Sequence, residues 1–313
     1  MIHITGATGH IGNNLVRLLI EKKIPFQLLE RQSGPALNGL PVKEVTGDIF
    51  DPHFLNAHVS PKDTIIHIAA LIDLKNKQSQ ESDKINYIGT KTIIDFCIKQ
   101  QVRLIYTSSV DCINRDKQQA IIKEPDTINP ELLTSNYAAS KGKATRYLLN
   151  QMQANALDAV VLYPSAVIGV HDYKPSAAGI EIMHSLKRRV YFYIKGGYNF
   201  IDVRDIAKAI ETCIEKRITG SYILAGHNRT LLDFYHQIAK TLGRRAFYCP
   251  IPASIAKAFV HFIPRFSRMM VDAVLDNYHY DNSLMCRDLL DTVTPFEQTV
   301  ADTIEWFQSQ PKR

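Results

Sequence analysis

Residues 5 to 12 read Thr5-Gly6-Ala7-Thr8-Gly9-His10-Ile11-Gly12, and they stand between an apolar run, residues 1–4, and an amphipathic stretch, residues 13–21. Glycines at this spacing let the backbone turn tightly, approach a pyrophosphate closely and pack a helix against a strand. The helix that follows presents free N–H groups to phosphates. A pattern of this kind also occurs in plain loops, but the strand before it and the helix after it favour a dinucleotide site. We expect these residues to contact the cofactor: Thr5, Gly6, Thr8, Gly9, His10, Ile11 and Gly12.

Outward from this motif, short apolar runs alternate with amphipathic stretches. The runs occupy residues 26–29, 64–68, 103–107 and 159–163, and helical patterns occupy residues 88–99 and 138–150. This alternation indicates β-α-β units, whose crossovers are right-handed. The alternation ends after residue 163. From residue 231 onward, helical patterns separated by prolines dominate, and the last of them covers residues 295–308.

The sequence therefore predicts an α/β protein, a Rossmann-type doubly wound parallel sheet with a smaller, mostly helical C-terminal substrate lobe. We expect residues 1–163 and 190–225 to form the nucleotide-binding domain, and residues 164–189 and 226–313 the substrate-binding lobe.

The composition bounds the class of protein. Hydrophobic residues make up 45% of the 313 residues and charged residues 22%, which is typical of a globular chain. The net charge is +6, but Lys and Arg are spread along the chain, so no nucleic-acid partner is expected. No apolar run approaches membrane-spanning length, which argues against membrane insertion. Five scattered cysteines without a C-x-x-C pair predict reduced thiols, no metal site and, with no room for a signal peptide before residue 5, a cytoplasmic protein.

The end of the second apolar run carries two opposed signals for the cofactor. Glu30 stands where an acid would bond the adenosine ribose hydroxyls, which favours NAD. Arg31 and Ser33 follow at once and would bind a 2′-phosphate, which favours NADP. Because Arg31 can pair with both Glu30 and a phosphate, the expected cofactor is NADP(H), with NAD as the alternative.

A second constellation carries acid–base chemistry. In Tyr137-Ala138-Ala139-Ser140-Lys141, the i and i+4 residues share one face of a helix, so the ammonium lies near the phenol. A close cation is expected to lower the phenol pKa from its ordinary value of about 10. The same spacing also arises by chance in surface pairs. Upstream, however, the run at 104–107 ends in Ser108 and Ser109, hydroxyls at a strand end.

In this order the motifs resemble the extended branch of the short-chain dehydrogenase/reductase superfamily, the NAD-dependent epimerase/dehydratase family. Three further stretches carry the resemblance: Gly47-Asp48-Ile49, Ile66-His67-Ile68-Ala69-Ala70, and Asn86-Tyr87-Ile88-Gly89-Thr90. Tyr163-Pro164-Ser165-Ala166-Val167 adds a fourth. The resemblance implies that Ser109, Tyr137 and Lys141 are catalytic. It implies cofactor contacts from Asp48, Ile49, Ala69, Ala70, Asn86, Tyr137, Lys141, Pro164, Ser165 and Val167. A plain turn is the alternative for Asp48, and His67 is expected to be a packed structural residue.

Two enzyme classes share these motifs. Sugar-nucleotide epimerases and dehydratases usually carry an Arg where this chain has Tyr198-Asn199. The Gly-Gly-Tyr-Asn form is more similar to bacterial relatives of dihydroflavonol 4-reductase and of the 3β-hydroxysteroid dehydrogenases. The expected activity is reduction of a ketone or aldehyde on a small apolar or aromatic substrate. A nucleotide-sugar epimerase or dehydratase is the alternative, with Lys187, Arg188 and Arg189 meeting the phosphates. A non-catalytic binder ranks last because Tyr137 and Lys141 are both present. The resemblance also implies a homodimer through the helix that bears Tyr137 and its neighbour.

Overall fold

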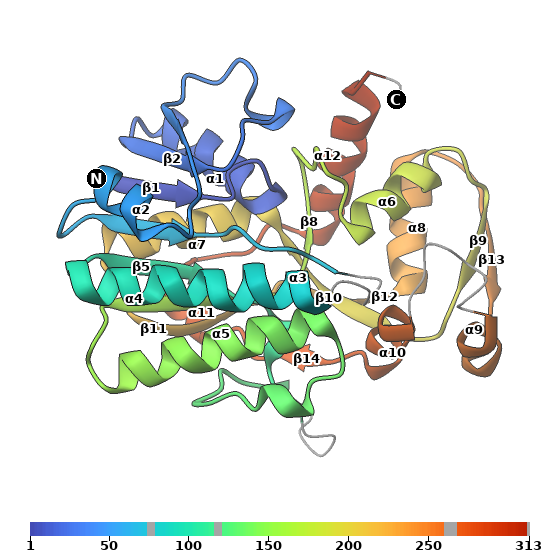
Figure 1. Ribbon diagram of the computed structural model, residues 1–313. Coiled ribbons are helices and arrows are strands. Elements are labelled where there is room, and N and C mark those ends of the chain that lie inside the picture. The colour runs from blue at the N-terminus through green and yellow to red at the C-terminus, as the bar shows by residue number, and fades with distance from the viewer. Residues whose placement is uncertain (74–78, 116–120, 260–267, 312–313) are drawn as a thin grey trace.

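A parallel sheet of seven strands forms the centre of the molecule (Figure 1). The computed structural model describes residues 1–73, 79–115, 121–259 and 268–311. The strand order is β11-β7-β5-β4-β1-β2-β3, and each neighbouring pair runs parallel. The strands are β1 (Ile2–Thr5), β2 (Phe26–Glu30), β3 (Glu44–Thr46), β4 (Thr64–His67), β5 (Arg103–Thr107), β7 (Ala159–Pro164) and β11 (Gly220–Leu224). The predicted fold class is confirmed.

Helices cover both faces of this sheet (Figure 1). One face packs against α1 (His10–Glu21), α7 (Val203–Glu215) and α11 (Ser283–Asp288), and the other against α2 (Pro52–His58), α4 (Thr90–Gln100) and α5 (Asn136–Gln153). The two faces of the sheet carry separate hydrophobic cores, and adjacent residues of β4 contribute to each. Ile65 packs in the core on the α4 and α5 side, and Ile66 packs in the core on the α1 and α7 side. Both side chains are fully buried, which explains why these strands read as continuous apolar runs.

The element bounds differ from the sequence expectation mainly where helices begin. The strand at 103–107 is found as predicted, whereas the helix expected at 138–150 extends over Asn136–Gln153 because Ser135 caps it, its side chain accepting from the Ala138 N–H. The helix expected at 88–99 begins at Thr90. A short helix, α3 (Ser79–Ser82), and a π-helical segment, η2 (Asp83–Gly89), precede it. A π-helical turn does not follow the 3.6-residue period, so periodicity alone could not predict it.

The remaining elements form a second layer beside the carboxyl ends of the central strands. A three-stranded sheet has the order β12-β10-β8, with β8 (Ala166–Ile168), β10 (Gly197–Asp202) and β12 (His227–Thr230). Its core packs against α6 (Ala177–Ser185), α8 (Leu231–Thr241) and α12 (Phe296–Ser309). Two strands, β9 (Val190–Tyr193) and β13 (Phe247–Pro250), form a parallel ribbon that leads to α9 (Ala253–Phe259). Helix α10 (Arg268–Asp276) and the short pair of β14 (His279–Tyr280) with β6 (Ile121–Ile122) follow.

The C-terminal lobe is thus mostly helical with small sheets. Strands β9 and β10, which the sequence division assigns to the nucleotide-binding domain, pair within these small sheets and not with the central sheet. Helix α7 and strand β11 of the same range belong to the central layers. The division of the chain into two domains at the predicted residues stays a proposal.

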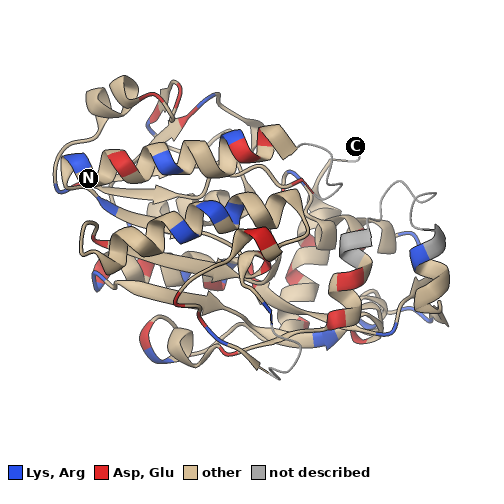
Figure 2. Cartoon of the chain, turned by 60° about the horizontal axis from the view of Figure 1, so that its bottom comes forward, with Lys and Arg blue, Asp and Glu red and all other residues tan. Residues whose placement is uncertain are grey.

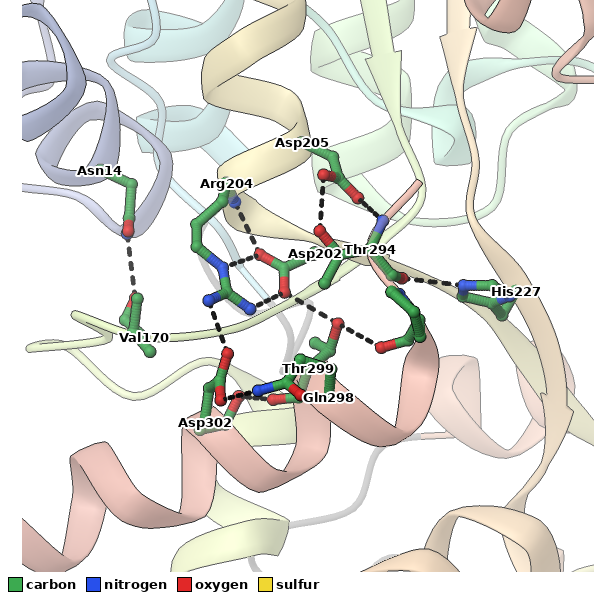
Figure 3. Close-up of polar contacts among 12 residues, drawn as sticks. Asn14, Val170, Asp202, Arg204, Asp205, His227, Thr294, Gln298, Thr299 and Asp302 are labelled. Carbon is green, nitrogen blue, oxygen red and sulfur yellow. Dashed lines mark hydrogen bonds and ion pairs between the residues drawn. The ribbon is translucent and has the colours of Figure 1, made fainter. Parts of the chain in front are cut away.

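A buried polar cluster joins α12 to the start of α7 (Figure 3). Asp202 caps α7 by accepting from the Arg204 N–H at 2.8 Å, and its carboxylate also accepts from the Arg204 guanidinium at 2.6 Å and from Thr299 Oγ1 at 2.8 Å. Arg204 reaches on to Asp302 at 2.6 Å. Asp205 accepts from the Thr294 N–H at 2.7 Å. The expected structural role of Asp202 and Asp205 is confirmed, although Asp205 anchors the loop before α12 and does not cap α7.

Candidate active site

The glycine-rich loop connects β1 to α1 and is tightly packed. Gly6 has φ of +80°, and a Cβ there would lie 2.5 Å from the Ala69 nitrogen. A Cβ on Gly12 would lie 2.3 Å from the Gly6 oxygen. Helix α1 begins after Gly9 with no side-chain cap and no acidic residue in its first turn. Its N-terminal N–H groups therefore stay available for an anion, which fits the pyrophosphate of a dinucleotide.

Glu30, at the end of β2, lies beneath this loop. Its Oε1 accepts from the Ala7 N–H at 2.5 Å, and the side chain is buried. Burial raises the pKa of Glu30 to about 7, although the Ala7 and Gly6 N–H groups pull it in the opposite direction. Glu30 therefore supports the glycine loop from below, and near neutral pH its carboxyl group exchanges between charged and neutral forms.

The residues around Glu30 include two cofactor candidates predicted from the sequence and one that the sequence did not indicate. Arg31 is exposed, and Ser33 Oγ donates to Glu44 Oε1 at 3.2 Å. Lys174, in the segment after β8, is near enough to lower the pKa of Glu30 by its charge. No motif in the sequence indicates Lys174, because it comes from a loop more than a hundred residues downstream. The adenosine side of the loop thus has a second cation beside Arg31.

The segment that carries Lys174 closes over the start of α1. The Val170 carbonyl accepts from Asn14 Nδ2 at 2.9 Å (Figure 3) and lies 3.0 Å from His10 Nε2. Farther along, Tyr173 Oη accepts from Arg17 Nη2 at 3.2 Å. His10 is thereby engaged with a protein carbonyl, so its predicted contact with the cofactor is a proposal that has to accommodate this bond.

Asn86 fixes the segment that follows Ala69 and Ala70. Its Oδ1 accepts from the Leu71 N–H at 2.7 Å, and its Nδ2 donates to the Leu71 carbonyl at 2.9 Å and to Ser140 Oγ at 3.1 Å. Both ends of the buried amide are thus used within the chain. Asn86 positions the Ala69-Ala70 backbone against Gly6 and ties it to α5.

His67 forms a buried link between the loop and α4. Its Nδ1 lies 2.7 Å from Thr5 Oγ1 and its Nε2 lies 3.0 Å from Thr90 Oγ1. Burial, with a smaller effect from the charge of Lys141, lowers the pKa of His67 to about 3, so the imidazole is neutral. The structural role expected for His67 is confirmed.

Lys141 lies within the core of the site. Its Nζ donates to the Thr107 carbonyl at 2.7 Å and lies 4.7 Å from the centre of the Tyr106 ring. Burial lowers the pKa of Lys141 to about 8. An ammonium group has three donors, so two remain for other partners beside the one that Thr107 accepts.

The Ser109 hydroxyl, which accepts from the Asp111 N–H at 3.2 Å, is near enough to the Tyr137 phenol to influence its pKa. Burial raises the pKa of Tyr137, the charge of Asp111 raises it further, and Ser109 opposes both. The Lys141 ammonium donates to the Thr107 carbonyl, and burial is the largest influence on the phenol. The lowering of the Tyr137 pKa by Lys141 together with the oxidised nicotinamide therefore stays a prediction. Ser108 instead lies 2.7 Å from Thr145 Oγ1, inside the core.

Asp111, whose charge acts on Tyr137, belongs to a group of polar and aromatic side chains. Arg115 donates to Tyr280 Oη at 3.0 Å, lies 3.4 Å from Asp111 and stacks at 4.4 Å on the Tyr278 ring. Burial raises the pKa of Tyr198, and the charges of Asp111 and Arg115 act on it in opposite directions, so the β10 tyrosine belongs to the same group. We call Asp111, Arg115, Tyr198, Tyr278 and Tyr280 the mouth residues. Of these, the sequence singled out only Tyr198, since the others lie in segments without a motif.

The other residues that the sequence predicts to contact the cofactor lie after β3, at the end of β7, and in or just before β8. Pro164 ends β7, and Val167 lies in the middle of β8. Ser165 is buried and donates to Asn199 Oδ1 at 2.8 Å. Asp48 is exposed and accepts from the Phe50 N–H at 3.0 Å, whereas Ile49 packs in the α4 and α5 core.

Neither a helix that could span a membrane nor a cluster of metal ligands occurs among the described residues. None of their helices is both long and apolar enough to cross a membrane. Within residues 1–73, 79–115, 121–259 and 268–311, no three His, Cys, Asp or Glu side chains gather in a way that could hold a metal ion.

Comparisons with known proteins agree with this geometry. The model of the "NAD dependent epimerase/dehydratase family" matches residues 2–225. "Sterol demethylase protein B" of Methylococcus capsulatus is 24% identical, covering 98% of this chain and 98% of that protein. A "putative dihydroflavonol 4-reductase" of Synechocystis is 29% identical, covering 98% of this chain and 94% of that protein.

Solved structures share the fold. The crystal structure of gox2253 aligns with a TM-score of 0.84 at 24% identity, over 98% of both chains. The dTDP-glucose 4,6-dehydratase of Bacillus anthracis, in complex with NAD, aligns with a TM-score of 0.76 at 18% identity, over 98% of this chain and 96% of that one. The similar proteins therefore include some that are named reductases and some that are named dehydratases.

Proposed function

Because the chain belongs to the NAD-dependent epimerase/dehydratase family, we propose that it is an NAD(P)-dependent oxidoreductase that reduces a ketone or aldehyde on a small apolar or aromatic substrate. The observation that carries this proposal is the group around Tyr137. The charge of Asp111 acts on both the Tyr137 phenol and Tyr198, and Arg115, which stacks on the Tyr278 ring, already has Asp111 as an acidic partner.

The side chains suit a proton donor next to a carbonyl. A raised pKa keeps the Tyr137 phenol protonated at neutral pH, so it can give its proton to the carbonyl oxygen. Ser109 accepts from the Asp111 N–H close to the phenol, and its hydroxyl is suited to donate to the substrate oxygen. The reduced nicotinamide supplies the hydride when it is bound. Lys141, fixed by Thr107, is suited to hold the nicotinamide ribose with its two remaining donors.

Three observations support NADP(H) as the preferred cofactor. Arg31 is exposed beside the loop, and Lys174 supplies a second cation near it. The pKa of Glu30 is about 7, so this carboxyl group is partly neutral at physiological pH and repels a 2′-phosphate less than an ordinary glutamate would. NAD remains the alternative, bound through the ribose hydroxyls and the ionised form of Glu30.

The mouth residues favour an apolar or aromatic substrate over a sugar nucleotide. A desolvated diphosphate needs several charge-assisted hydrogen bonds. Arg115 is a cation close to Tyr198, which the sequence did not indicate, but it is engaged by Asp111 and Tyr280. Lys187, Arg188 and Arg189 lie on the exposed turn between α6 and β9, and Arg188 is 3.6 Å from Glu181.

One observation supports the second candidate, a nucleotide-sugar epimerase or dehydratase. Asp111 is close enough to Tyr137 to raise its pKa, so a second group capable of proton transfer stands beside the phenol. Such reactions need a proton transfer in addition to the hydride step. Dehydratases also occur among the relatives, as in the dTDP-D-glucose 4,6-dehydratase of mouse, 24% identical over 72% of this chain.

A panel experiment separates the two candidates. We expect weak or no binding of UDP-, GDP- and dTDP-sugars in calorimetry, and NAD(P)H-dependent reduction of apolar or aromatic ketones and aldehydes followed by absorbance of the reduced nicotinamide. The Tyr137→Phe variant should bind cofactor as the parent does and lose about 10³-fold in turnover. Tight sugar-nucleotide binding with an epimerised or dehydrated product would overturn the reductase proposal.

The cellular location, the size of the substrate and the oligomeric state are also proposals. We infer a cytoplasmic enzyme with a small-molecule substrate, and a homodimer formed through α5 and the neighbouring α4. Sedimentation velocity at micromolar concentration tests the dimer, and a single species of the mass of one chain, 35.4 kDa, would contradict it.

A further inference from the structure

The ribbon of β9 and β13 has one apolar face that points to solvent. In its parallel register Phe247 pairs with Val190 and Cys249 with Phe192. The exposed fractions are 71% for Phe247, 64% for Phe192 and 43% for Val190. The intervening pair, Tyr191 and Tyr248, turns inward, and these rings stack 5.8 Å apart. We call Val190, Phe192 and Phe247 the outer face of the ribbon.

Apolar surface continues beyond the end of the ribbon. Ile255, two residues into α9, has an exposed fraction of 49%. A cavity of about 420 Å³ lies where both strands end, and its lining includes Ile194, Pro250, Ile251 and Leu275. Several large apolar side chains exposed side by side are typical of a surface that binds a protein or a membrane. Single exposed apolar residues are not.

The same part of the chain is strongly biased in charge. Residues 186–201 and 242–259 contain no Asp or Glu, and their cations are Lys187, Arg188, Arg189, Lys195, Arg244, Arg245 and Lys257. Within the part of the chain that the structure describes, two of the seven have acidic partners from other segments, Arg188 at 3.6 Å from Glu181 and Lys257 at 2.6 Å from Asp272. Along the helices that cover the central sheet, by contrast, basic and acidic positions are interspersed (Figure 2). Exposed cations therefore flank the outer face on both strands.

We propose that the outer face of the ribbon docks on the surface of an anionic phospholipid bilayer. Phe192 and Phe247 enter the interfacial layer, and the flanking cations, chiefly Lys187, Arg189 and Arg245, lie against the headgroups. Aromatic side chains ringed by Lys and Arg are the composition that binds such interfaces. This is attachment at the surface and requires no spanning helix.

A second copy of the chain fits this face less well. A two-fold contact places a patch against itself, so Arg189 and Arg245 would meet cations of the other copy without an acidic residue between them. An anionic membrane supplies the missing negative charge to every cation at once. Charge complementarity therefore selects the bilayer.

Docking in this way would bring the apolar cavity close to the membrane. Helix α10 contacts both the cavity and the start of β10, since Leu275 lines the cavity and Val274 packs directly on Gly196, two residues before Tyr198. If the proposed function holds, an apolar substrate dissolved in the bilayer has a short path to Tyr198. The docking itself does not depend on the proposed function and is tested without turnover.

Vesicle flotation of the full chain tests the docking. We expect wild-type protein to bind vesicles of 70% phosphatidylcholine and 30% phosphatidylglycerol at least tenfold more than vesicles of pure phosphatidylcholine, and the binding to fall when salt is raised from 50 to 500 mM. The double variant Phe192→Ser/Phe247→Ser should lose at least tenfold of that binding. Arg189→Gln/Arg245→Gln should lose binding and much of the salt dependence.

Matched controls remove the same kinds of side chain elsewhere. Leu132→Ser removes an apolar side chain that is 70% exposed on another surface, and Lys99→Gln/Lys216→Gln removes two exposed cations of α4 and the end of α7. Both should bind like the wild type. Equal binding to both vesicle types, unchanged binding of the serine variant, or equal losses in the controls would overturn the proposal. A different result in sedimentation would also overturn it: wild-type protein forms a concentration-dependent dimer and does not bind vesicles, and the Phe192→Ser/Phe247→Ser variant stays monomeric.

Discussion

The charge of Asp111 acts on a phenol that is already hard to ionise. Burial is the largest cause of the raised pKa of Tyr137, and Asp111 is the second. Tyr137 must stay protonated for reduction, but it must lose its proton to accept one from an alcohol in the reverse direction. Asp111 therefore biases the site toward reduction.

Replacing Asp111 by Asn should weaken that bias. With the charge removed, the pKa of Tyr137 falls, so the pH at which alcohol oxidation reaches half its maximum should move down by about half a pH unit, the effect of one partly exposed charge. Initial rates of oxidation, taken up to the highest pH at which the protein stays folded, measure this. Glu131→Gln, an exposed acid on η4 (Pro130–Leu132), serves as control and should leave the profile unchanged. A shift to higher pH would contradict the role of Asp111.

Lys141 predicts a pH limit for cofactor binding. Its pKa is lowered by burial to about 8, so the ammonium that would hold the ribose is lost as the pH rises above that value. We expect the dissociation constant of NADPH to rise by up to about tenfold between pH 8 and pH 9. Fluorescence titration measures it.

Two variants of Lys141 sharpen this test. Lys141→Arg keeps a charge at every pH in the range and should make the affinity nearly constant from pH 7 to 9.5. Lys141→Met should bind weakly throughout. An affinity of the parent that does not change over this range would show that the ammonium does not hold the cofactor.

Glu30 predicts a cofactor preference that depends on pH. Its pKa of about 7 is above the ordinary 4.5, so the group is mostly neutral at pH 6 and mostly charged at pH 8. The charged form repels a 2′-phosphate and accepts from ribose hydroxyls. The ratio of NADP(H) affinity to NAD(H) affinity should therefore fall by about tenfold, ~1.4 kcal/mol, from pH 6 to pH 8.

The phosphate of the ligand also titrates near pH 6, so a variant has to isolate the protein group. Glu30→Gln keeps an acceptor for the Ala7 N–H and removes the titration. Its affinity ratio should retain only the dependence that the phosphate itself causes. If the parent and Glu30→Gln gave the same pH dependence, Glu30 would have no part in cofactor selection.

At the scale of elements, the attachment of α12 depends on one buried carboxylate. Asp202 caps α7, pairs with Arg204 and accepts from Thr299 (Figure 3). Asp202→Ala should lower the free energy of unfolding by about 3 kcal/mol, because it leaves Arg204 and the Thr299 hydroxyl without their acceptor. Urea unfolding measures the loss. Asp302→Asn, at the more exposed end of the same cluster, should cost less than about 1 kcal/mol; equal losses would mean that the burial of Asp202 is unimportant.

Sequence alone was sufficient for elements whose patterns repeat. The apolar run at 103–107 and the glycine motif each follow from a local rule, and the structure has both in place. The start of α4 was not predictable, since the π-helical segment before it lacks a regular period. The sequence did not predict the group of mouth residues for another reason. Arg115 and Tyr280 are far apart in sequence and meet only because β14 pairs with β6.

At the scale of the whole molecule, the polar cluster of Asp202 predicts that both layers unfold together. The single tryptophan, Trp306, lies on α12 and packs edge-on at 5.2 Å from the Tyr173 ring, so its fluorescence reports on this part of the molecule. Circular dichroism reports on all helices. In urea the two transitions should coincide for the parent protein, whereas in Asp202→Ala the fluorescence change should come first. Separate transitions in the parent would show that the layers are energetically independent.

The pairing of β14 with β6 also has a consequence for how the protein is made. During translation the central sheet has all its strands once β11 has left the ribosome, but Tyr278, Tyr280 and α12 emerge last. A nascent chain can therefore form the glycine loop and its supporting carboxylate before it can surround Tyr137 on the substrate side. The newborn protein would acquire a place for the dinucleotide first, and selectivity for its substrate only once β14 has been made.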